Sequence, residues 1–487
     1  MLSLGAFAAQ ILTVLSLAVL ARLLTKSQLG TYQQLGLVFS IVSTLLIAGL
    51  PSALLYFLPR ASSVTERRRW VFDTYVVMSG FGLIGALGLF LLRDTLAHAL
   101  GNPRLALAFA YYAPFVLFGP ISGATGAALV GQGRSRLSAL LTSLNAATLS
   151  GGMIVAALIS PSAVAVAAGA SIASGAFTVI SLAAVIGSVG ITPPRSVKEI
   201  AVTPLLRYGI PLALTGAVGI LGGQLDRIVV TSKFSAADYA VYAIGAAQVP
   251  LLYLVRQPVN NVLVRALSAR FDAGDLSGAA DLWRESMRKL SLVVMPVFVY
   301  SEIMARDLIR VMYGTKWGAS VEIFRIYQTL LLTQITTWGL ITLAAGRTRE
   351  NIWGAVILLV LNGAIAYALI GPFGLDGAAV ATPLATLGAI AYFLLRIRAI
   401  FHLEIRELGP WAGITLNLLL SGAAGVPILA IALLPGPAVL RLGISALVFL
   451  VSYLFIMRAA RRITDEDWFR LRGALGRLHP GAAATAV

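Results

Sequence analysis

An arginine with polar neighbours on one helix face is the clearest chemical feature of the sequence. Arg256 lies between two prolines inside a stretch of mostly apolar residues. Tyr253, Arg256 and Asn260 are spaced at i, i+3 and i+7, so a helix would present them on one face. A guanidinium stays charged and can bind a diphosphate through two parallel N–H donors, which makes this face a candidate anion site. The alternative role of Arg256 is a structural ion pair with a carboxylate such as Glu302.

A second polar group lies in a glycine-rich apolar stretch. Asp226 and Arg227 are neighbours in sequence, so they point to different sides of a helix. Gln224, Arg227 and Thr231 share one face, where Arg227 could line a cavity, and Asp226 is a candidate carboxylate for a proton or a cation. Asp226 and Arg227 could instead snorkel or pair near the membrane boundary.

Two further ionisable residues are candidates of the same kind. Glu302 is either a carboxylate for a coupling ion or the partner of Arg256. Arg22 ends the first apolar stretch, where snorkelling to the membrane boundary is the simplest role. Arg325 follows Glu322 by three residues, and this spacing predicts a local ion pair.

These charges stand out because the rest of the chain is apolar. The 487 residues are 58% hydrophobic and 12% charged, with a mean hydropathy of +0.88, whereas soluble domains carry about 25% charged residues. A soluble globular enzyme is therefore excluded. The chain has no cysteine and three scattered histidines, which excludes disulfides, thiolate metal sites and a histidine metal centre. We expect no cofactor.

Fourteen stretches are long and apolar enough to cross a membrane, since a spanning helix needs about 20 residues. Their bounds are about 1–24, 34–58, 70–92, 105–131, 137–159, 163–189, 204–231, 238–265, 287–310, 322–345, 351–371, 375–397, 411–434 and 438–459. The pattern predicts an all-α polytopic membrane protein with about 14 transmembrane helices.

The basic residues are distributed unequally between the two sets of alternate loops. Most of the 37 Lys and Arg residues fall in one set and in the C-terminal tail. Because basic loops stay in the cytoplasm, this bias predicts that both termini are cytoplasmic. It also explains the net charge of +17 without a nucleic-acid partner.

The connections are short. The largest cytoplasmic one, about residues 265–289, reads as a short charged helix, and the longest outer one is about residues 306–320. No G-x-x-x-x-G-K-[ST] motif occurs, so transport driven by ATP hydrolysis in this chain is excluded. After Arg462, a capping Thr464 and apolar residues on one face predict an amphipathic helix at the membrane surface.

An internal repeat divides the chain into two similar halves. The loop Gly133–Arg136 reads GRSR and has a twin, GRTR, at Gly346–Arg349, 213 residues later. Likewise Thr25–Tyr32 reads TKSQLGTY, and Ser235–Tyr242 reads SAADYAVY at an offset of 210. Arg60 and Arg270, each after the second span of its half, share this offset.

The repeat predicts the domain organisation. Residues 1–190 form an N-lobe of six spans, 204–400 a C-lobe of six spans, 411–460 two further spans and 461–487 a cytoplasmic tail. Six spans return the chain to the same side of the membrane, so the copies are parallel. A pseudo-two-fold axis along the membrane normal, with a substrate cavity between the lobes, is typical of two-lobed secondary transporters.

Several segments resemble one transporter family in their order and spacing. They are Ala21-Arg22-Leu23-Leu24 through Leu29-Gly30-Thr31-Tyr32, Arg207-Tyr208-Gly209-Ile210-Pro211 followed by Leu225-Asp226-Arg227, and Gly374-Leu375-Asp376-Gly377-Ala378-Ala379. Nearly the whole chain resembles the Wzx-like polysaccharide flippase branch of the MOP superfamily of multidrug, oligosaccharidyl-lipid and polysaccharide exporters. The chain departs from the family pattern at Thr25-Lys26, where the family often has Gly-Pro.

The resemblance implies a function. Members of this branch move undecaprenyl-diphosphate-linked oligosaccharides across the bacterial inner membrane, for O-antigen, capsule or exopolysaccharide synthesis. It implies membrane lipid and polysaccharide polymerase or assembly proteins as partners, and adds Arg22 to the candidate cavity residues. Alternating access is the expected mechanism, with H+ or Na+ as candidate coupling ions.

Three other functions compete with this interpretation. A MATE-type drug or cation antiporter usually has twelve spans and an acidic cation site, whereas the surplus charge within these spans is arginine. A polysaccharide polymerase would carry a large periplasmic loop. A lipid II flippase shares the fourteen spans and the cationic cavity, and only its substrate separates it from a polysaccharide flippase.

Overall fold

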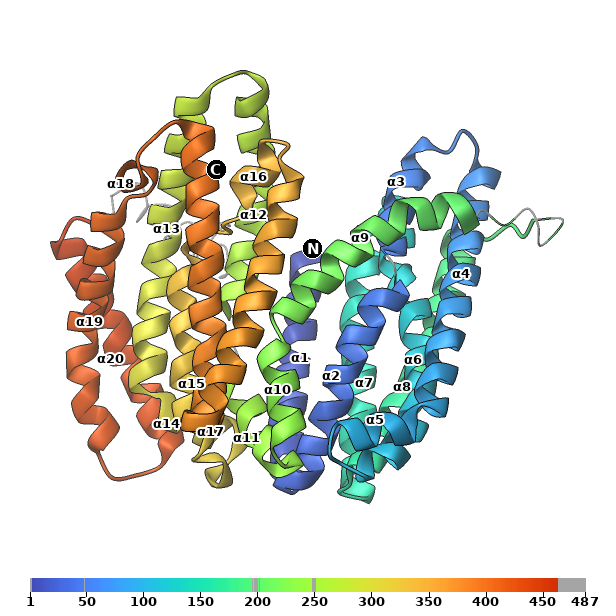
Figure 1. Ribbon diagram of the computed structural model, residues 1–487, viewed down its shortest axis with the longest axis horizontal. Helices are drawn as coiled ribbons and strands as arrows, with labels where there is room; N and C mark the ends of the chain where they lie inside the picture. Colours follow the sequence, from blue (N-terminus) through green and yellow to red (C-terminus); the bar gives the residue numbers. More distant parts are fainter. Residues whose placement is uncertain are drawn as a thin grey trace, which may run out of the picture.

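The structure is a two-lobed bundle of helices. The computed structural model describes residues 2–462 except 48, 195, 197–199, 201 and 248–250, and no side chains at 2–4, 45, 215, 251–258 and 261. Every regular element within these residues is a helix, which confirms the all-α class. The lobes meet at one end and diverge at the other (Figure 1). The predicted surface helix after Arg462 lies outside the described residues.

The N-lobe carries the first predicted spans in order. Its helices are α1 (Leu2–Leu23), α2 (Lys26–Ile47), α3 (Leu50–Phe57), η1 (Leu58–Arg60), α4 (Val64–Leu91), α5 (Arg93–Ala99), α6 (Arg104–Val130), α7 (Ser135–Ile159) and α8 (Ala163–Ser188). The second predicted span is broken between α2 and α3, where Gly49 has a φ of 64° that suits glycine.

The C-lobe is more interrupted than the N-lobe. Its helices are α9 (Val202–Gly222), α10 (Leu225–Lys233), α11 (Ala236–Gly245), α12 (Leu251–Asp272), α13 (Leu276–Ile303), α14 (Ala305–Tyr313), η3 (Thr315–Trp317), α15 (Ser320–Gln328), η4 (Thr329–Ile335), α16 (Leu340–Ala344) and α17 (Thr348–Phe401). A last group, α18 (Ile405–Leu408), α19 (Trp411–Leu433) and α20 (Ala438–Ala459), adds a hairpin that packs on α13.

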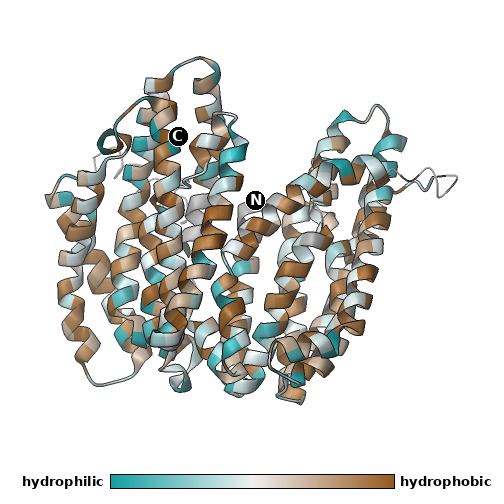
Figure 2. Cartoon of the chain, viewed as in Figure 1, coloured by the Kyte–Doolittle hydropathy of each residue, from teal (hydrophilic) through white to brown (hydrophobic). Residues whose placement is uncertain are grey.

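These helices match a multi-pass membrane protein. Nine helices in the described part of the chain are long and apolar enough to cross a membrane. One of them, α17, has 54 residues, more than twice the roughly 20 that a bilayer requires. It is kinked at Gly374, whose φ of 59° and ψ of −134° are not helical, so it covers two predicted spans. Apolar residues follow the helices and hydrophilic ones gather at their ends (Figure 2).

The interpretation of residues 265–289 as a separate short helix is wrong. The charged residues of this segment belong to the end of α12, at Asp272, and to the start of α13, at Leu276. A turn of three residues separates the two helices. Asp275 caps α13, because its Oδ1 accepts a hydrogen bond from the Gly278 N–H at 2.8 Å. This bond, supported by Arg270, holds the pKa of Asp275 below its ordinary value.

The matched loops of the repeat have the same backbone conformation. Gly133 and Gly346 have φ values of 77° and 73°. The next N–H donates five residues back in each loop, from Arg134 to Leu129 O at 2.9 Å and from Arg347 to Thr342 O at 2.8 Å. Both loops are therefore the same helix-ending turn, as a duplicated unit would have.

One helix links the two lobes across their diverging ends. The first half of α9 lies on the N-lobe, where Tyr208 stacks on Tyr56 of α3 with ring centroids 4.6 Å apart. The last residue, Gly222, lies against α17, where an added Cβ would be 3.3 Å from the Ala355 carbonyl oxygen. In Figure 1 this helix runs obliquely between the lobes.

The kink at Gly374 provides a test of the fold. An alanine there would be strained because its φ is positive, although its Cβ would meet no atom within 4 Å. We expect Gly374→Ala to cost about 1–3 kcal/mol of stability and to lower the melting temperature of the purified protein. Gly371→Ala is the matched control, since it also has open space and no positive φ. Equal melting temperatures for the two variants would contradict a strained backbone at position 374 and therefore the kink at Gly374.

Candidate functional site

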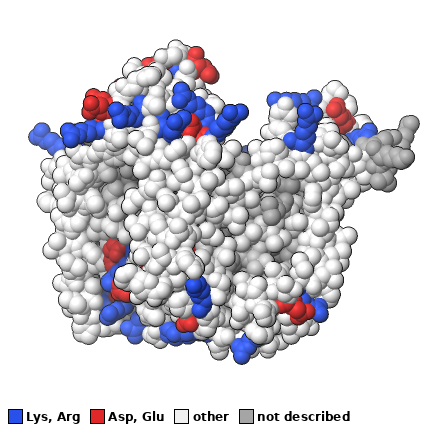
Figure 3. Space-filling view, viewed as in Figure 1, with Lys and Arg blue, Asp and Glu red and all other residues white. Residues whose placement is uncertain are grey.

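The candidate site is the space between the lobes. Figure 3 shows the surface hollowed between them at the end where Lys and Arg side chains gather. At the other end the lobes are in contact, because α2 packs on α11 and α1 packs on α14. The space is therefore open toward the basic face and closed toward the opposite face. We call the contacts at the closed end the seal.

The centre of the seal is built from the two repeated segments. Thr25–Tyr32 begins α2, and its twin Ser235–Tyr242 begins α11. A Cβ at Gly30 would overlap the carbonyl oxygen of Ala236, so the two backbones approach closely. Tyr239 and Tyr242 are fully buried in the apolar cluster around this contact. The pseudo-symmetry thus places equivalent helices face to face where the lobes meet.

Side chains of the C-lobe cap the end of α1. The indole Nε1 of Trp317 donates to Ala21 O at 3.1 Å, and the Lys316 ammonium donates to Leu24 O at 2.6 Å. The last carbonyl groups of a helix lack partners within that helix, so these bonds complete α1 only while the seal is closed. In the opposite direction, the Arg22 guanidinium donates to Val311 O of α14.

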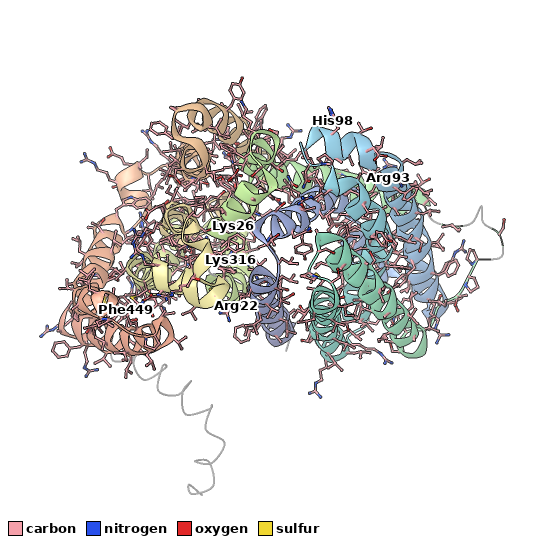
Figure 4. All side chains as sticks on the ribbon, turned by 90° about the horizontal axis from the view of Figure 1, so that it is seen from below. Arg22, Lys26, Arg93, His98, Lys316 and Phe449 are labelled. Carbon is pink, nitrogen blue, oxygen red and sulfur yellow. The ribbon has the colours of Figure 1, made fainter. Side chains whose placement is uncertain are left out.

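The labelled residues of Figure 4 show where these contacts lie. Arg22, Lys26 and Lys316 lie close together near the middle of the closed face, at the junction of the lobes. Arg93 and His98 lie away from this junction, on the N-lobe. The structure therefore places Arg22, a predicted cavity residue, at the seal. Its role in substrate binding stays a prediction.

The face predicted for Gln224, Arg227 and Thr231 is turned largely toward the N-lobe. Ser40 Oγ donates to Gln224 Oε1 at 3.1 Å, and Gln34 Nε2 donates to Thr231 Oγ1. Both acceptors lie in α10 or at its start, and both donors lie in α2. Two polar contacts therefore join the lobes above the seal.

Asp226 is buried in a tyrosine cage inside the C-lobe. Its Oδ2 accepts hydrogen bonds from the phenols of Tyr242 and Tyr327. Its other oxygen, Oδ1, is buried without a hydrogen-bond partner in the described part of the chain. A buried carboxylate with an open lone pair fits a proton or a small cation, although the assignment of Asp226 as a coupling site stays a prediction.

Arg227 adjoins this cage but faces another helix. Its Nη2 donates to Ala246 O at 3.3 Å, at the end of α11. Its Nε is buried and has no hydrogen-bond acceptor among the described residues. The guanidinium therefore keeps unused donor capacity, which is compatible with the predicted anion contact.

The predicted tenth span is broken in the middle. Helix α15 is followed by the 3₁₀ turn η4, and Thr336 is extended, with φ −155° and ψ 169°, before α16 begins at Leu340. Non-helical backbone inside a membrane occurs where protein buries it or where it lines a polar cavity. A pocket of about 480 Å³ adjoins the break.

The lining of this pocket combines polar, aromatic and aliphatic residues. Its polar members are Thr333, Gln334, Thr336, Thr337, Asn351, Thr382 and Thr386. Trp338 and Phe393 provide aromatic rings, and the lining residues include no charged side chain. Hydroxyl and amide groups both donate and accept hydrogen bonds. The pocket therefore offers a neutral ligand both hydrogen-bonding groups and apolar or aromatic surface.

Polar anchors hold the broken segment in place. Trp283 Nε1 donates to Thr336 Oγ1 at 2.9 Å, and Asn260 Nδ2 donates to Thr337 Oγ1 at 2.7 Å. Asn260, a predicted binding residue, thus supports the pocket from α12, and its buried Oδ1 has no partner among the described residues. The side chains of Tyr253 and Arg256 lie outside the described residues, so their roles stay predictions.

Glu302 lies near the end of α13 and is not among the residues that line the pocket beside Thr336. Its Oε1 is buried without a hydrogen-bond partner within the described residues. The charged groups that act on it are Arg325 and Glu322 of α15. The predicted local pair between those two is confirmed at 3.2 Å. The coupling role of Glu302 stays a prediction.

Comparison with known proteins assigns the family. Residues 19–322 match the family described as polysaccharide biosynthesis protein. The chain belongs to this family. Over 60 residues it is 38% identical to protein 1 of the Lsg locus of Haemophilus influenzae, a stretch covering 12% of this chain and 15% of that protein.

Solved structures show how widely the fold is shared. The lipid II flippase MurJ in an inward closed conformation matches with a TM-score of 0.74 and 15% identity, over 94% of this chain and 99% of that chain. A multidrug resistance MATE family transporter in an inward-facing conformation matches with a TM-score of 0.65 and 14% identity, over 81% and 96%. The family match confirms the predicted resemblance to polysaccharide biosynthesis proteins, and the chain shares the fold of these two transporters.

Sequence reasoning missed two groups of residues. The sequence pattern assigns Lys316 and Trp317 only to an outer connection, because their bonds to α1 depend on how the lobes meet. It assigns the pocket residues around Thr336 to one uninterrupted span. A signal was present, because Thr333–Gly339 reads TQITTWG within an otherwise apolar stretch.

The capping of α1 leads to a test of the seal. We expect Lys316→Met to open the seal more often, because a bond of about 1 kcal/mol after solvent screening is lost. This corresponds to an approximately five-fold shift between states. A cysteine at Ala240, buried in α11, should then react faster with a membrane-impermeant maleimide, and the absence of native cysteines removes background labelling.

Lys26→Met provides the control for this test. Lys26 lies beside Lys316 on the same face (Figure 4), but no hydrogen bond from its side chain to the C-lobe is seen in the described part of the chain. In the Lys26→Met variant, the cysteine at position 240 should react with the maleimide as slowly as it does in the parent protein. Equal rates for both lysine variants would show that the Lys316 bonds do not hold the seal.

Proposed function

We propose that this protein is a flippase that moves an undecaprenyl-diphosphate-linked oligosaccharide across the bacterial inner membrane. The observation that carries the proposal is the uncharged pocket at the broken tenth span, in a chain of the polysaccharide biosynthesis family. Binding a glycan requires hydroxyl and amide groups beside aromatic rings, whereas binding a drug or a cation in an antiporter does not. The basic end of the molecule is the cytoplasmic side in this proposal, with both termini there.

Each part of the substrate has a place in the proposed mechanism. The diphosphate is attracted to the basic opening, and Arg256, Arg227 and Arg22 are the arginines proposed to contact it. The first sugars occupy the pocket beside Trp338, while the prenyl chain stays in the lipid. Polymerase and assembly proteins are proposed as partners on the other side of the membrane.

Release requires the seal to open. Closing the basic end would bring the lobes together there, and the contacts between α2 and α11 would separate. Water or the released headgroup would then solvate the carbonyl groups at the end of α1 in place of Lys316 and Trp317. Asp226 is the proposed site at which H+ or Na+ drives this change, because it is buried with one free oxygen.

The first experiment measures the lipid-linked sugars of a strain lacking this gene, separately for each leaflet. A membrane-impermeant reagent that modifies sugars distinguishes the two leaflets. We expect one undecaprenyl-linked oligosaccharide to accumulate on the cytoplasmic side. Arg256→Ala should reproduce the defect, and Arg256→Lys should restore it only in part, because lysine keeps the charge without the bidentate fork.

Other outcomes of this experiment would replace the proposal. An unchanged pool with altered sensitivity to toxic cations would indicate an antiporter. Single repeat units on the periplasmic side would indicate a polymerase. Accumulation of the cell-wall precursor on the cytoplasmic side would indicate a lipid II flippase.

The pocket can be tested separately with a nearly isosteric substitution. Thr386→Val removes one hydroxyl group from the lining. We expect the apparent KM for the accumulated oligosaccharide lipid to rise about five-fold in reconstituted vesicles, since one hydrogen bond contributes about 1 kcal/mol. Thr142→Val is the matched control, because both hydroxyls donate to the carbonyl four residues earlier, at 2.7 and 2.8 Å. An unchanged KM in both variants would exclude a glycan contact at Thr386.

A further inference from the structure

Helix α14 carries two arginines that the proposed transport path does not use. Its nine residues lie at the closed end of the molecule, with Ala305, Ile309 and Tyr313 buried in the apolar cluster that joins the two lobes. Arg306 and Arg310 follow at i and i+4 on the opposite, exposed face. Neither guanidinium has a hydrogen bond or an ion pair within the described residues. Two adjacent cations therefore stand at the membrane boundary without a protein partner.

The C-terminal hairpin turns this surface into a pocket. Helices α19 and α20 pack against α13 and α14 and leave a space of about 540 Å³. Arg306, Arg310 and Arg325, the last of which is paired with Glu322, line one side. Leu429, Leu433 and Leu434 of the hairpin line the other. Leu433 is 87% exposed, so this side faces the lipid. The pocket thus joins a cationic wall to an apolar wall.

The acidic residue of the pocket is already neutralised. Both carboxylate oxygens of Asp307 accept hydrogen bonds from Arg441 of α20. The same guanidinium donates to the carbonyl oxygens of Leu434 at 3.1 Å and Gly436 at 2.9 Å. These hydrogen bonds fix the hairpin loop to α14, and Arg441 neutralises the carboxylate of Asp307. The charge of Arg306 and Arg310 is left for an external anion.

We propose that this pocket binds the phosphate of an anionic glycerophospholipid in the leaflet at the closed end. A phosphodiester matches two arginine side chains one helical turn apart, because each guanidinium offers parallel N–H donors. An acyl chain would lie along Leu429 and Leu433, which are already exposed to lipid. A soluble phosphate would use only the cationic wall, so the apolar wall favours a lipid.

The site adjoins the seal. Val311 of α14 accepts the hydrogen bond from Arg22, and α14 also packs on α1. A lipid held by Arg306 and Arg310 would therefore rest on the helix that joins the lobes at the closed end. This lipid contact does not depend on which substrate the protein transports.

The repeat provides a built-in comparison. Helix α5 occupies in the N-lobe the place of α14, between the third and fourth spans of its half. Among the described residues, α5 packs on α4 and α6 and not on the C-terminal hairpin. Its basic residue Arg93 already contacts Asp94 at 3.5 Å and the ring of Phe90 at 4.5 Å. The lipid pocket is thus a feature that only the C-terminal hairpin creates.

The test uses the purified full chain in nanodiscs of phosphatidylcholine with a minor fraction of phosphatidylglycerol. Native mass spectrometry counts the lipids retained after release from the disc. We expect the parent protein to retain phosphatidylglycerol in preference to phosphatidylcholine. Combined Arg306→Gln and Arg310→Gln should weaken this retention about tenfold, and Arg93→Gln should leave it unchanged. The lysine variants at 306 and 310 should retain an intermediate amount.

Four results would overturn the proposal. The first is equal retention by the glutamine variants and the parent, provided that their melting temperatures agree. The second is equal retention of phosphatidylcholine and phosphatidylglycerol by the parent. The third is displacement of phosphatidylglycerol by inorganic phosphate or by undecaprenyl phosphate at equal concentration, which would assign the pocket to another anion. A loss of retention in Arg93→Gln would likewise place the lipid elsewhere.

Discussion

The absence of water in the membrane interior is the constraint on which this structure depends. Each peptide N–H and C=O group in the hydrocarbon needs a partner within the protein, so the chain forms helices. Breaks in those helices then require a specific explanation. The kink at Gly374, the separation of α2 from α3 and the unwound segment around Thr336 all occur where glycine or polar side chains make the break tolerable.

The same constraint explains the seal. The carbonyl groups at the end of α1 have no partner within their own helix. Trp317 and Lys316 of the C-lobe provide donors for them, so one lobe completes the hydrogen bonding of the other. Such a contact is stable when closed and can be replaced by water when open. It is therefore suited to a transporter that alternates between two states.

Polar groups inside the C-lobe are divided between structure and proposed function. Asn260, Trp283 and their threonine acceptors fix the broken span. Asp226 is held by two tyrosines but keeps one oxygen free, and Arg227 keeps a donor free. Buried polar groups in membranes are normally satisfied because an unsatisfied group is costly. The open atoms of Asp226 and Arg227 are the ones at which a coupling ion and a transported anion are proposed to bind.

The sequence by itself determined the fold class, the two-lobe organisation and the candidate charges. Hydrophobic length locates membrane helices without tertiary information, and the matching segments GRSR at Gly133 and GRTR at Gly346 indicate the duplication. Only the tertiary structure decided which residues meet. Lys316 caps α1 across nearly 300 residues of chain, and the pocket beside Thr336 arises because one predicted span unwinds. Both depend on how helices pack, and apolar periodicity does not specify the partner of an exposed donor or acceptor.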